Sequence, residues 1–424
     1  MDPRKLLLDS FNAAIAAVDP LRIVPPYLPR YLPEGRTFVA GAGKAAAAMA
    51  LAVENQWQKD AVLNGIVVTR KGHGLPLKRI TVVEAGHPIP DERGARAARD
   101  ILAEVEKLGA DDLLLCLISG GGSSLLSFPV AGVSIDDLQN VTRELLRCGA
   151  EIQEINAVRK HLSAVHGGRL AASCHAPVLA LIISDVTGDD PAHIASGPCA
   201  PDPTTYSDAL GILEYYGINA PAAVTETLLA GTRGKRNETP KPGDAVFCHV
   251  ENRVVATAHD SLLAAAKYFR GHGVPAVILG DSVTGEARDV AKVFAALVKE
   301  IRKYGQPWKP PVALLSGGET TVTLRAEGRG GPNTEFLLSL AIHLNDVPQI
   351  HALACDTDGI DGSENNAGAI ATSDALRRAT QTGINAAALL AGNNSYAFFE
   401  QIGDLVVTGP TRTNVNDYRV VLIL

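Results

Sequence analysis

A lysine preceded by two glycines follows a short apolar segment, and this combination could bind a phosphate. The stretch FVAGAGKAAAAMA, residues 38–50, reads as a strand, a Gly41-Ala42-Gly43-Lys44 turn and the start of a helix. Backbone N–H groups and the positive end of a helix dipole favour an anion at such a point. The lysine adds positive charge that a bound anion would offset. The alternative is a solvent-facing lysine at an ordinary helix start.

The residues around this turn separate two phosphate-binding motifs. A Walker A loop is excluded, because it needs four residues between its first glycine and Gly-Lys, and Ser or Thr where this chain has Ala45. The dinucleotide pattern G-x-G-x-x-G/A is matched, with Ala46 in the last place. The acidic residue expected at the end of the next strand is missing, since GIVVTRK ends in Thr69, Arg70 and Lys71, which could at best suit the 2'-phosphate of NADP. The dinucleotide interpretation therefore stays open on a partial match.

Two Ser-Gly-Gly loops each follow an apolar strand. The first, ISGGGSSLL at 118–126, lets successive backbone N–H groups turn inward toward an anion. It lacks the G-x-S-x-G spacing of a serine-hydrolase elbow, which disfavours a serine nucleophile. The second is VALLSGGETT at 312–321. The predicted substrate-binding or phosphate-binding residues of the turn and both loops are Gly41, Gly43, Ser119, Gly120, Gly121, Gly122, Ser123, Gly317, Gly318 and Glu319.

Aspartates cluster after two further strands. LIISDVTGDDPAHIASGP places Asp185, Asp189 and Asp190 in a loop, and CDTDGIDG places Asp356, Asp358 and Asp361 in another. Clustered carboxylates suit Mg2+ or the proton of a hydroxyl group. The alternative is that aspartates favour turns and helix caps. The second loop departs from the EF-hand pattern.

An arginine lies among glycines before an expected helix. EGRGGPNTE contains Arg329, whose guanidinium could bind a phosphate or carboxylate with two hydrogen bonds, and Asn333, a further candidate binding residue. A surface loop is the alternative. The histidines lie singly, without a close ligand spacing, so transition-metal binding is disfavoured.

Composition favours a multidomain α/β enzyme. The 424 residues are 46% hydrophobic and 20% charged, with 40 glycines and a net charge of −7. This charge offers no basic surface for nucleic acid or an anionic membrane. Six scattered cysteines without a CxxC pair indicate free thiols in a reducing cytoplasm. The N-terminus lacks the apolar core of a signal peptide, no segment approaches the length of a membrane span, and we expect a cytoplasmic protein.

Strand and helix patterns alternate along both halves of the chain. The polar, Gly- and Pro-rich stretch 231–243 is the best linker candidate, so we expect domains at 1–235 and 236–424. The alternation predicts two α/β domains, each a mostly parallel sheet flanked by helices, with the N-terminal one Rossmann-like. Loops beyond strand ends in both domains would place an active site in the cleft between them.

Nine motifs in this order resemble the class II glycerate 2-kinase family, whose C-terminal part is called MOFRL. They are GAGKAA, EAGHPIPDERG, LISGGGSSLL, VRKHLSAVHGGRLA, SDVTGDDPAHIASGP, LLSGGETTV, GRGGPNTEF, DTDGIDG and TGPTRTNVND. The resemblance covers nearly the whole chain and places the MOFRL region at about 310–420. It implies transfer of the γ-phosphoryl group of ATP to the 2-hydroxyl of D-glycerate with Mg2+, and catalytic roles for Lys44 and Arg329.

The resemblance also organises the remaining candidates. We expect Asp185 or Asp189 to accept the hydroxyl proton, and Asp190, Asp356 or Asp358 to bind Mg2+. ATP, Mg2+ and D-glycerate are the expected ligands, and a homodimer is the candidate assembly. Lys44 and Arg329, one from each domain, would meet across the transferring phosphoryl group. Two alternatives stay open: an NAD(P)H-dependent hydroxypyruvate reductase, a name some relatives have carried, and a non-catalytic sugar-acid binding protein.

Overall fold

The computed structural model describes residues 2–424 and divides the chain into two compact units. The N-terminal unit is Pro20–Ala256, and the C-terminal unit combines the residues up to Asp19 with Thr257–Leu424. This division differs from the boundary expected at 235/236. The strand RVVATA, which we expected in the second domain, instead supplies β6 (Val250–Ala256), which pairs with β5 (Val178–Ile183) of the first sheet.

The N-terminal unit is built on six parallel strands in the order β3-β2-β1-β4-β5-β6. This is the strand order of the dinucleotide-binding doubly wound fold, so the Rossmann-like prediction is confirmed. The remaining strands are β1 (Thr37–Ala42), β2 (Leu63–Arg70), β3 (Ile80–Ala85) and β4 (Leu113–Ile118). The helices are α2 (Pro20–Ile23), α3 (Ala46–Gln56), α4 (Glu92–Val105), α5 (Gly122–Leu125), α6 (Ile135–Arg147), α7 (Ile152–Leu162), α8 (Arg169–Ala172), α9 (Tyr206–Tyr215) and α10 (Ala222–Thr232).

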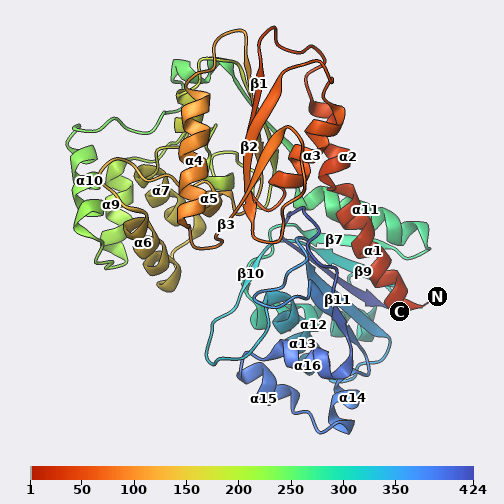
Figure 1. Ribbon diagram of the computed structural model, residues 1–424. Coiled ribbons are helices and arrows are strands. Elements are labelled where there is room, and N and C mark those ends of the chain that lie inside the picture. The colour runs from red at the N-terminus through yellow and green to blue at the C-terminus, as the bar shows by residue number, and fades with distance from the viewer. Residues whose placement is uncertain (1) are drawn as a thin grey trace. The chain divides into compact units, whose positions relative to one another are not determined.

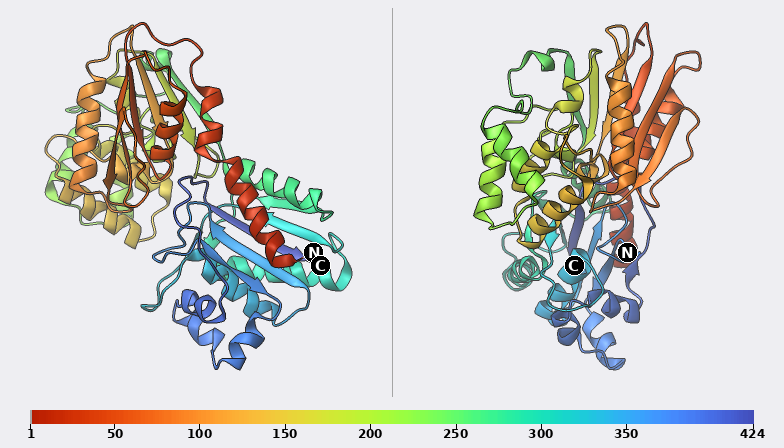
Figure 2. Two further views of the ribbon diagram at one scale, coloured as in Figure 1. Left: turned by 45° about the vertical axis from the view of Figure 1, so that its right-hand side comes forward. Right: turned by 60° about the vertical axis from the view of Figure 1, so that its left-hand side comes forward.

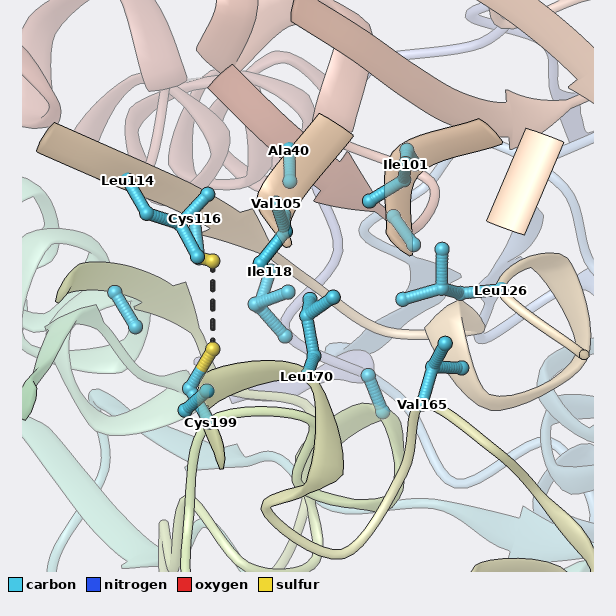
Figure 3. Packing of buried hydrophobic residues seen from close by; sticks show 14 of the residues in the cluster. Ala40, Ile101, Val105, Leu114, Cys116, Ile118, Leu126, Val165, Leu170 and Cys199 are labelled. Atoms are coloured by element: carbon cyan, nitrogen blue, oxygen red, sulfur yellow. Dashed lines mark hydrogen bonds between the residues drawn. The ribbon is translucent and has the colours of Figure 1, made fainter. Parts of the chain in front are cut away.

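Helices cover both faces of this sheet, with α3 on one side and α4 on the other (Figure 1). Strands covered on both faces become continuous apolar runs, which explains LLLCLI in β4 and VLALII in β5. In the core beneath α4, Cys116 and Ile118 of β4 pack with Ile101 and Val105 of the helix (Figure 3). A separate apolar cluster joins α6, α7, α9 and α10.

The C-terminal unit contains a six-stranded mixed sheet in the order β13-β12-β11-β14-β9-β7. Its strands are β7 (Ala276–Gly280), β9 (Val312–Ser316), β11 (Ile350–Asp356), β12 (Gly368–Thr372), β13 (Leu405–Val406) and β14 (Asp417–Ile423), and β8 (Gly285–Glu286) pairs with β10 (Thr320–Thr321) apart from it. The helices are α1 (Pro3–Ala17), α11 (Ala258–Gly271), α12 (Ala287–Tyr304), α13 (Pro332–Leu344), α14 (Ala375–Gln381), α15 (Ala386–Ala391) and α16 (Ser395–Ile402).

The prediction of a mostly parallel second sheet is wrong. Within the six-stranded sheet, β7 and β9 are the one parallel pair of neighbours; β14 lies between β9 and β11 and is antiparallel to both. The sequence showed strands alternating with helices, and the β9-α13-β11 connection does keep those two strands parallel. The last strand fills the gap between them, a pairing that no local pattern reveals.

Side chains of the C-terminal sheet alternate between two cores. Ala313 and Leu315 of β9 face α1 and α11, whereas Val312 and Leu314 face α12 and α13. This period of two places one set of side chains on each face of a strand. Helix α1 lies beside α11 (Figure 2), so the first helix of the chain belongs to the second unit. Within residues 2–424 no helix has both the length and the apolar character to cross a membrane.

Candidate functional site

The turn after β1 and the loop after β4 lie side by side in the N-terminal unit. Strands β1 and β4 are neighbours, and the strand order reverses between them. The crevice outside the strand ends at such a reversal is where doubly wound sheets bind ligands. The N–H of Lys44 donates to the carbonyl of Gly120 at 2.8 Å, and the N–H of Ala45 donates to Oγ of Ser119 at 3.0 Å. The lysine turn and the Ser-Gly-Gly loop therefore form one surface.

Gly43 is required by this close approach. Its φ of +133° is rare for residues with a side chain, and a Cβ there would overlap the Oγ and carbonyl of Ser119. The N–H groups from Gly43 to Ala46 all donate within the protein, to Val68, Gly120, Ser119 and Gly43. A pyrophosphate bound in the dinucleotide manner would need such groups. The backbone of the turn thus serves loop packing, so a phosphate at this point would be bound by the Lys44 side chain rather than by these N–H groups.

The loop after β4 keeps unpaired donors. Gly122 donates to the carbonyl of Ser119 at 3.2 Å, whereas the N–H groups of Gly120, Gly121 and Ser123 donate to no acceptor within residues 2–424. Gly121 has a φ of +80°, and a Cβ on it would lie 2.9 Å from the His87 ring and 3.6 Å from Cγ of Lys44. The lysine side chain, the unpaired N–H groups and His87 are therefore close neighbours.

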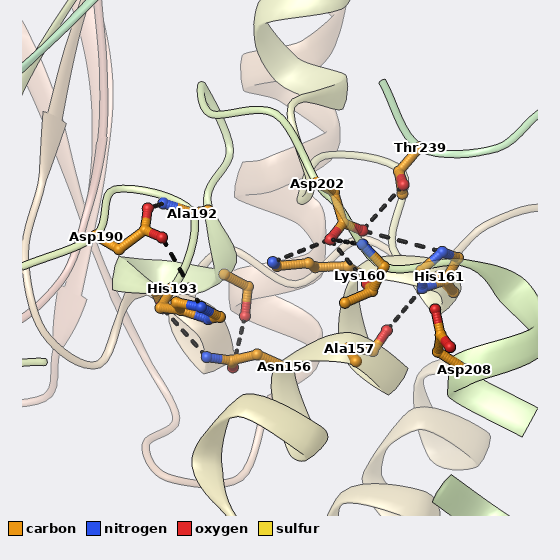
Figure 4. A network of polar contacts seen from close by, with 12 residues as sticks. Asn156, Ala157, Lys160, His161, Asp190, Ala192, His193, Asp202, Asp208 and Thr239 are labelled. Atoms are coloured by element: carbon orange, nitrogen blue, oxygen red, sulfur yellow. Dashed lines mark hydrogen bonds and ion pairs between the residues drawn. The ribbon is translucent and has the colours of Figure 1, made fainter. Parts of the chain in front are cut away.

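Helix α7 is tied to this loop through two hydroxyl groups. Oγ of Ser196 donates to Oδ1 of Asn156 at 2.9 Å and lies 2.8 Å from Oγ of Ser123. Asn156 in turn donates to the carbonyl of His193 at 3.1 Å, as Figure 4 shows. Sequence reasoning did not single out α7 as part of the site.

The aspartates after β5 form a turn. Asp185 is half-buried directly beyond the strand end. Asp189 adopts a left-handed φ of 53°, and Asp190 accepts the N–H of Ala192 at 2.8 Å while its second oxygen lies 4.0 Å from Nε2 of His193. Asp190 therefore stabilises a turn, which was the alternative to a catalytic or metal-binding role. Its exposed side chain could still reach a metal.

In the C-terminal unit the second Ser-Gly-Gly loop is held by the last strand. The guanidinium of Arg419 donates to the carbonyl oxygens of Gly317 at 3.1 Å and Gly318 at 3.5 Å, to the hydroxyl of Thr320, and to Asp417. Glu319 is exposed. The loop after β4 has unpaired N–H groups, whereas the loop after β9 has carbonyl groups that accept hydrogen bonds from Arg419. The two similar sequences therefore differ in chemistry.

Asn333 and Asp361 complete a buried polar network. Asn333 donates to Asp417 at 2.6 Å, and Asp361 accepts the N–H groups of Asn333 and Thr334 at the start of α13, each at 2.9 Å. Full burial raises the pKa of Asp361 to about 6, although these hydrogen bonds act to lower it. Asn333 is thus engaged with protein groups at the base of the α13 helix.

Asp356 and Asp358 stabilise the turn after β11. Oδ1 of Asp356 accepts the N–H of Asp358, and Oδ1 of Asp358 accepts the N–H of Ile360, both at 2.8 Å. Within residues 2–424 no three side chains of His, Cys, Asp or Glu gather at metal-binding distances. Mg2+ commonly takes only one or two protein carboxylates together with substrate phosphates, so these aspartates fit that smaller requirement.

Arg329 lies in an exposed loop of the C-terminal unit. Its guanidinium is 3.0 Å from Glu400 and 3.7 Å from Glu364, and 4.7 Å from the centre of the Tyr396 ring. Its side chain is 50% exposed. Lys44 and Arg329 belong to different units, and their meeting stays a prediction.

Sequence reasoning also missed a buried group of charges around α7. Lys160 pairs with Asp202 at 3.2 Å, as Figure 4 shows, and His161 contacts Glu238 at 3.2 Å. Glu238 lies beyond the boundary that we expected at 235/236, which explains why this segment stays with the N-terminal unit. The motif VRKHLSAVHGGRLA contained the signal, because four basic side chains (Arg159, Lys160, His161 and His166) occur within eight residues of a helix and turn that the fold buries.

Comparisons with known proteins agree along the whole chain. The model of a domain of unknown function, DUF4147, matches residues 6–229, and the MOFRL family model matches residues 312–417. A relative from Agrobacterium vitis, named provisionally as a hydroxypyruvate reductase, is 50% identical over 99% of this chain and 94% of its own length. A glycerate 2-kinase from Pyrococcus horikoshii is 39% identical over 100% of this chain and 98% of its own. The crystal structure of a glycerate kinase from Thermotoga maritima is 38% identical, covers 99% of each chain and has a TM-score of 0.87.

Proposed function

The chain belongs to the family in which a DUF4147 domain precedes a MOFRL region, and we propose that it is a glycerate 2-kinase. It transfers the γ-phosphoryl group of ATP to the 2-hydroxyl of D-glycerate, giving 2-phospho-D-glycerate and ADP. Relatives from two organisms that align over nearly the full chain carry kinase names, which supports this activity.

One observation carries the proposal: the Lys44 side chain and the unpaired N–H groups of Gly120, Gly121 and Ser123 lie close together at one strand-end edge of the sheet. Phosphoryl transfer requires positioning and neutralisation of negative charge more than covalent chemistry. An ammonium group beside fixed N–H donors supplies both. The N–H groups suit the carboxylate of glycerate, and the ammonium suits the transferring phosphoryl group.

Carboxylates in the same unit suit the proton transfer. Asp185 and Asp189 follow β5, the strand next to β4, so both lie at the strand-end edge that carries Lys44. Either would accept the proton of the 2-hydroxyl group as it attacks the phosphorus. Arg329 would stabilise the charge that develops on the phosphoryl oxygens, and it would exchange its contact with Glu400 for one with the phosphate.

Mg2+ would enter with the nucleotide. When bound, it neutralises charge on the β- and γ-phosphates. Asp190, with its exposed carboxylate, is our candidate ligand in the N-terminal unit, and Asp356 and Asp358 are the candidates in the C-terminal unit. Asp190→Asn and Asp358→Asn distinguish them, since the variant that lacks a ligand would require more Mg2+ for half-maximal rate.

The reductase alternative has weaker support. Two relatives that are each 50% identical to this chain carry that name, but two features of this chain argue against a dinucleotide site. The N–H groups from Gly43 to Ala46 are engaged within the protein, and β2 ends in Thr69 and Arg70 rather than an acidic residue.

Two assays run in parallel test the proposal. Mg-ATP and D-glycerate should yield ADP and 2-phosphoglycerate, identified against 3-phosphoglycerate by phosphorus NMR. NADPH and hydroxypyruvate should show no turnover. NADPH oxidation without ADP formation would establish the reductase, and glycerate binding without either reaction would establish the non-catalytic binder.

A further inference from the structure

Arg159 of α7 is a buried guanidinium without a partner. The residue is 9% exposed, and within residues 2–424 its guanidinium donates no hydrogen bond and forms no ion pair. Leaving a charge buried and unpaired is strongly destabilising. A bound anion would compensate this charge, and this is the simplest reason for a protein to retain it.

The nearby carboxylate of Asp202 does not neutralise the positive charge of Arg159. Lys160 takes one oxygen of Asp202 at 3.2 Å, and the hydroxyl groups of Thr204 and Thr239 donate to the same carboxylate. Burial lowers the pKa of Arg159 to about 10, and no carboxylate acts in the opposite direction. The guanidinium is therefore charged at neutral pH and has no counter-ion.

Helical spacing directs Arg159 toward the loop after β4. Asn156 lies three positions earlier, and residues three apart are neighbours on a helix face. That asparagine is linked through Ser196 to Ser123 of the loop. The face of α7 that carries Arg159 is therefore the one that supports the loop with unpaired N–H groups.

His166 lies near the same group. It is completely buried, and neither ring nitrogen has a hydrogen-bond partner. Burial, together with the charges of Arg159 and Lys160, lowers the pKa of His166 to about 3, so the ring is neutral at physiological pH. The surroundings of Arg159 thus contain unused hydrogen-bonding groups and no negative charge.

A small ligand can reach the guanidinium. Both ring nitrogens of His166 are inaccessible to solvent and lack a hydrogen-bond partner among the described residues. No nitrogen of Arg159 combines these two properties. Because those nitrogens also lack partners, each keeps some contact with solvent.

We propose that Arg159 binds an oxyanion of the reactants, a carboxylate or a phosphate group, beside the loop of residues 119–123. The planar guanidinium matches either group with two parallel hydrogen bonds. The identity of the ligands rests on the proposed function, whereas the anion-binding role rests on burial and the missing counter-ion alone.

Binding measurements without turnover test this role. Arg159→Met should leave the melting temperature of the unliganded protein unchanged or raised, because it removes an uncompensated charge. Calorimetric titration should show a dissociation constant raised roughly 10- to 100-fold for D-glycerate if the ligand group is the carboxylate, or for ADP if it is a phosphate. Arg159→Lys, which keeps the charge but not the planar fork, should lie between wild type and Arg159→Met.

Lys160→Met is the matched control, because Lys160 is the adjacent residue and is also buried, but is paired with Asp202. It should lower the melting temperature, since Asp202 loses its counter-ion, and leave ligand affinity in the folded protein unchanged. If Arg159→Met binds both ligands as wild type does, or loses as much thermal stability as Lys160→Met, the anion-binding role is wrong.

A third probe separates this proposal from the kinase assignment. Inorganic phosphate should raise the melting temperature of the wild-type protein and not that of Arg159→Met, whatever reaction the enzyme catalyses. If the protein does not phosphorylate D-glycerate but phosphate still stabilises the wild type and not Arg159→Met, the kinase assignment is wrong and the anion site is supported. Equal responses of the two proteins to phosphate, D-glycerate and ADP would overturn the anion site.

Discussion

The N–H of Lys44 donates a 2.8 Å hydrogen bond to the carbonyl of Gly120. This bond joins the turn after β1 to the loop after β4, and it fixes the backbone of the lysine while its side chain stays only partly buried. A fixed backbone suits a residue whose side chain must be positioned against a phosphoryl group in transfer.

Replacing Lys44 by alanine should reduce kinase turnover about 10²- to 10⁴-fold, the range expected when a group that stabilises transition-state charge is lost. The free energy of unfolding should change by less than about 1 kcal/mol, because the side chain is not part of the core. ADP release and thermal unfolding measure the two effects. Lys71→Ala, at an exposed lysine, should change neither.

Gly43→Ala should destabilise the N-terminal unit by about 2 to 4 kcal/mol, since the added Cβ overlaps backbone and side-chain atoms of Ser119 at an unfavourable φ. Gly72→Ala is the matched control. Gly72 has a φ of +82° but no heavy atom within 4 Å of an added Cβ, so its cost should be only about 1 kcal/mol. Urea denaturation would measure both, and equal losses would refute the packing role of Gly43.

Arg329→Ala should lower turnover at least about 10²-fold while leaving stability within about 1 kcal/mol of wild type. Its ion pairs with Glu400 and Glu364 are exposed and contribute little. Glu400→Gln removes one of these pairs without touching the arginine, and should retain activity. Comparable unfolding of both variants would assign Arg329 a structural role instead.

Protonation of Asp361 should make stability depend on pH. Burial raises its pKa from 3.8 to about 6, so between these values the folded state binds a proton that the unfolded state has released. Its contribution is fully present below pH 3.8 and is lost as pH rises toward 6, by about 3 kcal/mol at most.

Asp361→Asn provides the comparison for this effect. Urea denaturation of both proteins from pH 4 to pH 7 measures their unfolding free energies. The free energy of wild type minus that of the variant should fall as pH rises and level off above pH 6. A difference that is flat across the range would show that the carboxyl group titrates at its ordinary pKa.

Residue types and their order in the chain determined the α/β class, the parallel N-terminal sheet and the loops that carry chemistry. Apolar runs such as LLLCLI specify strands buried on both faces, and Gly-rich segments specify tight loops at their ends, so local physics suffices. The loop at 119–123 was found in this way, and so was Lys44. Their adjacency was not predicted, because it depends on the pairing of β1 with β4 in the folded sheet.

Pairing between distant segments was decided only by tertiary structure. The sequence does not reveal that β14 enters the C-terminal sheet antiparallel to both neighbours, or that α1 packs with α11. Arg159 illustrates the same point for function. Its place on α7 follows from helical spacing, but its burial without a counter-ion depends on which distant side chains surround it. An unpaired charge is a property of the packed interior, because the desolvation that makes it costly exists only after folding.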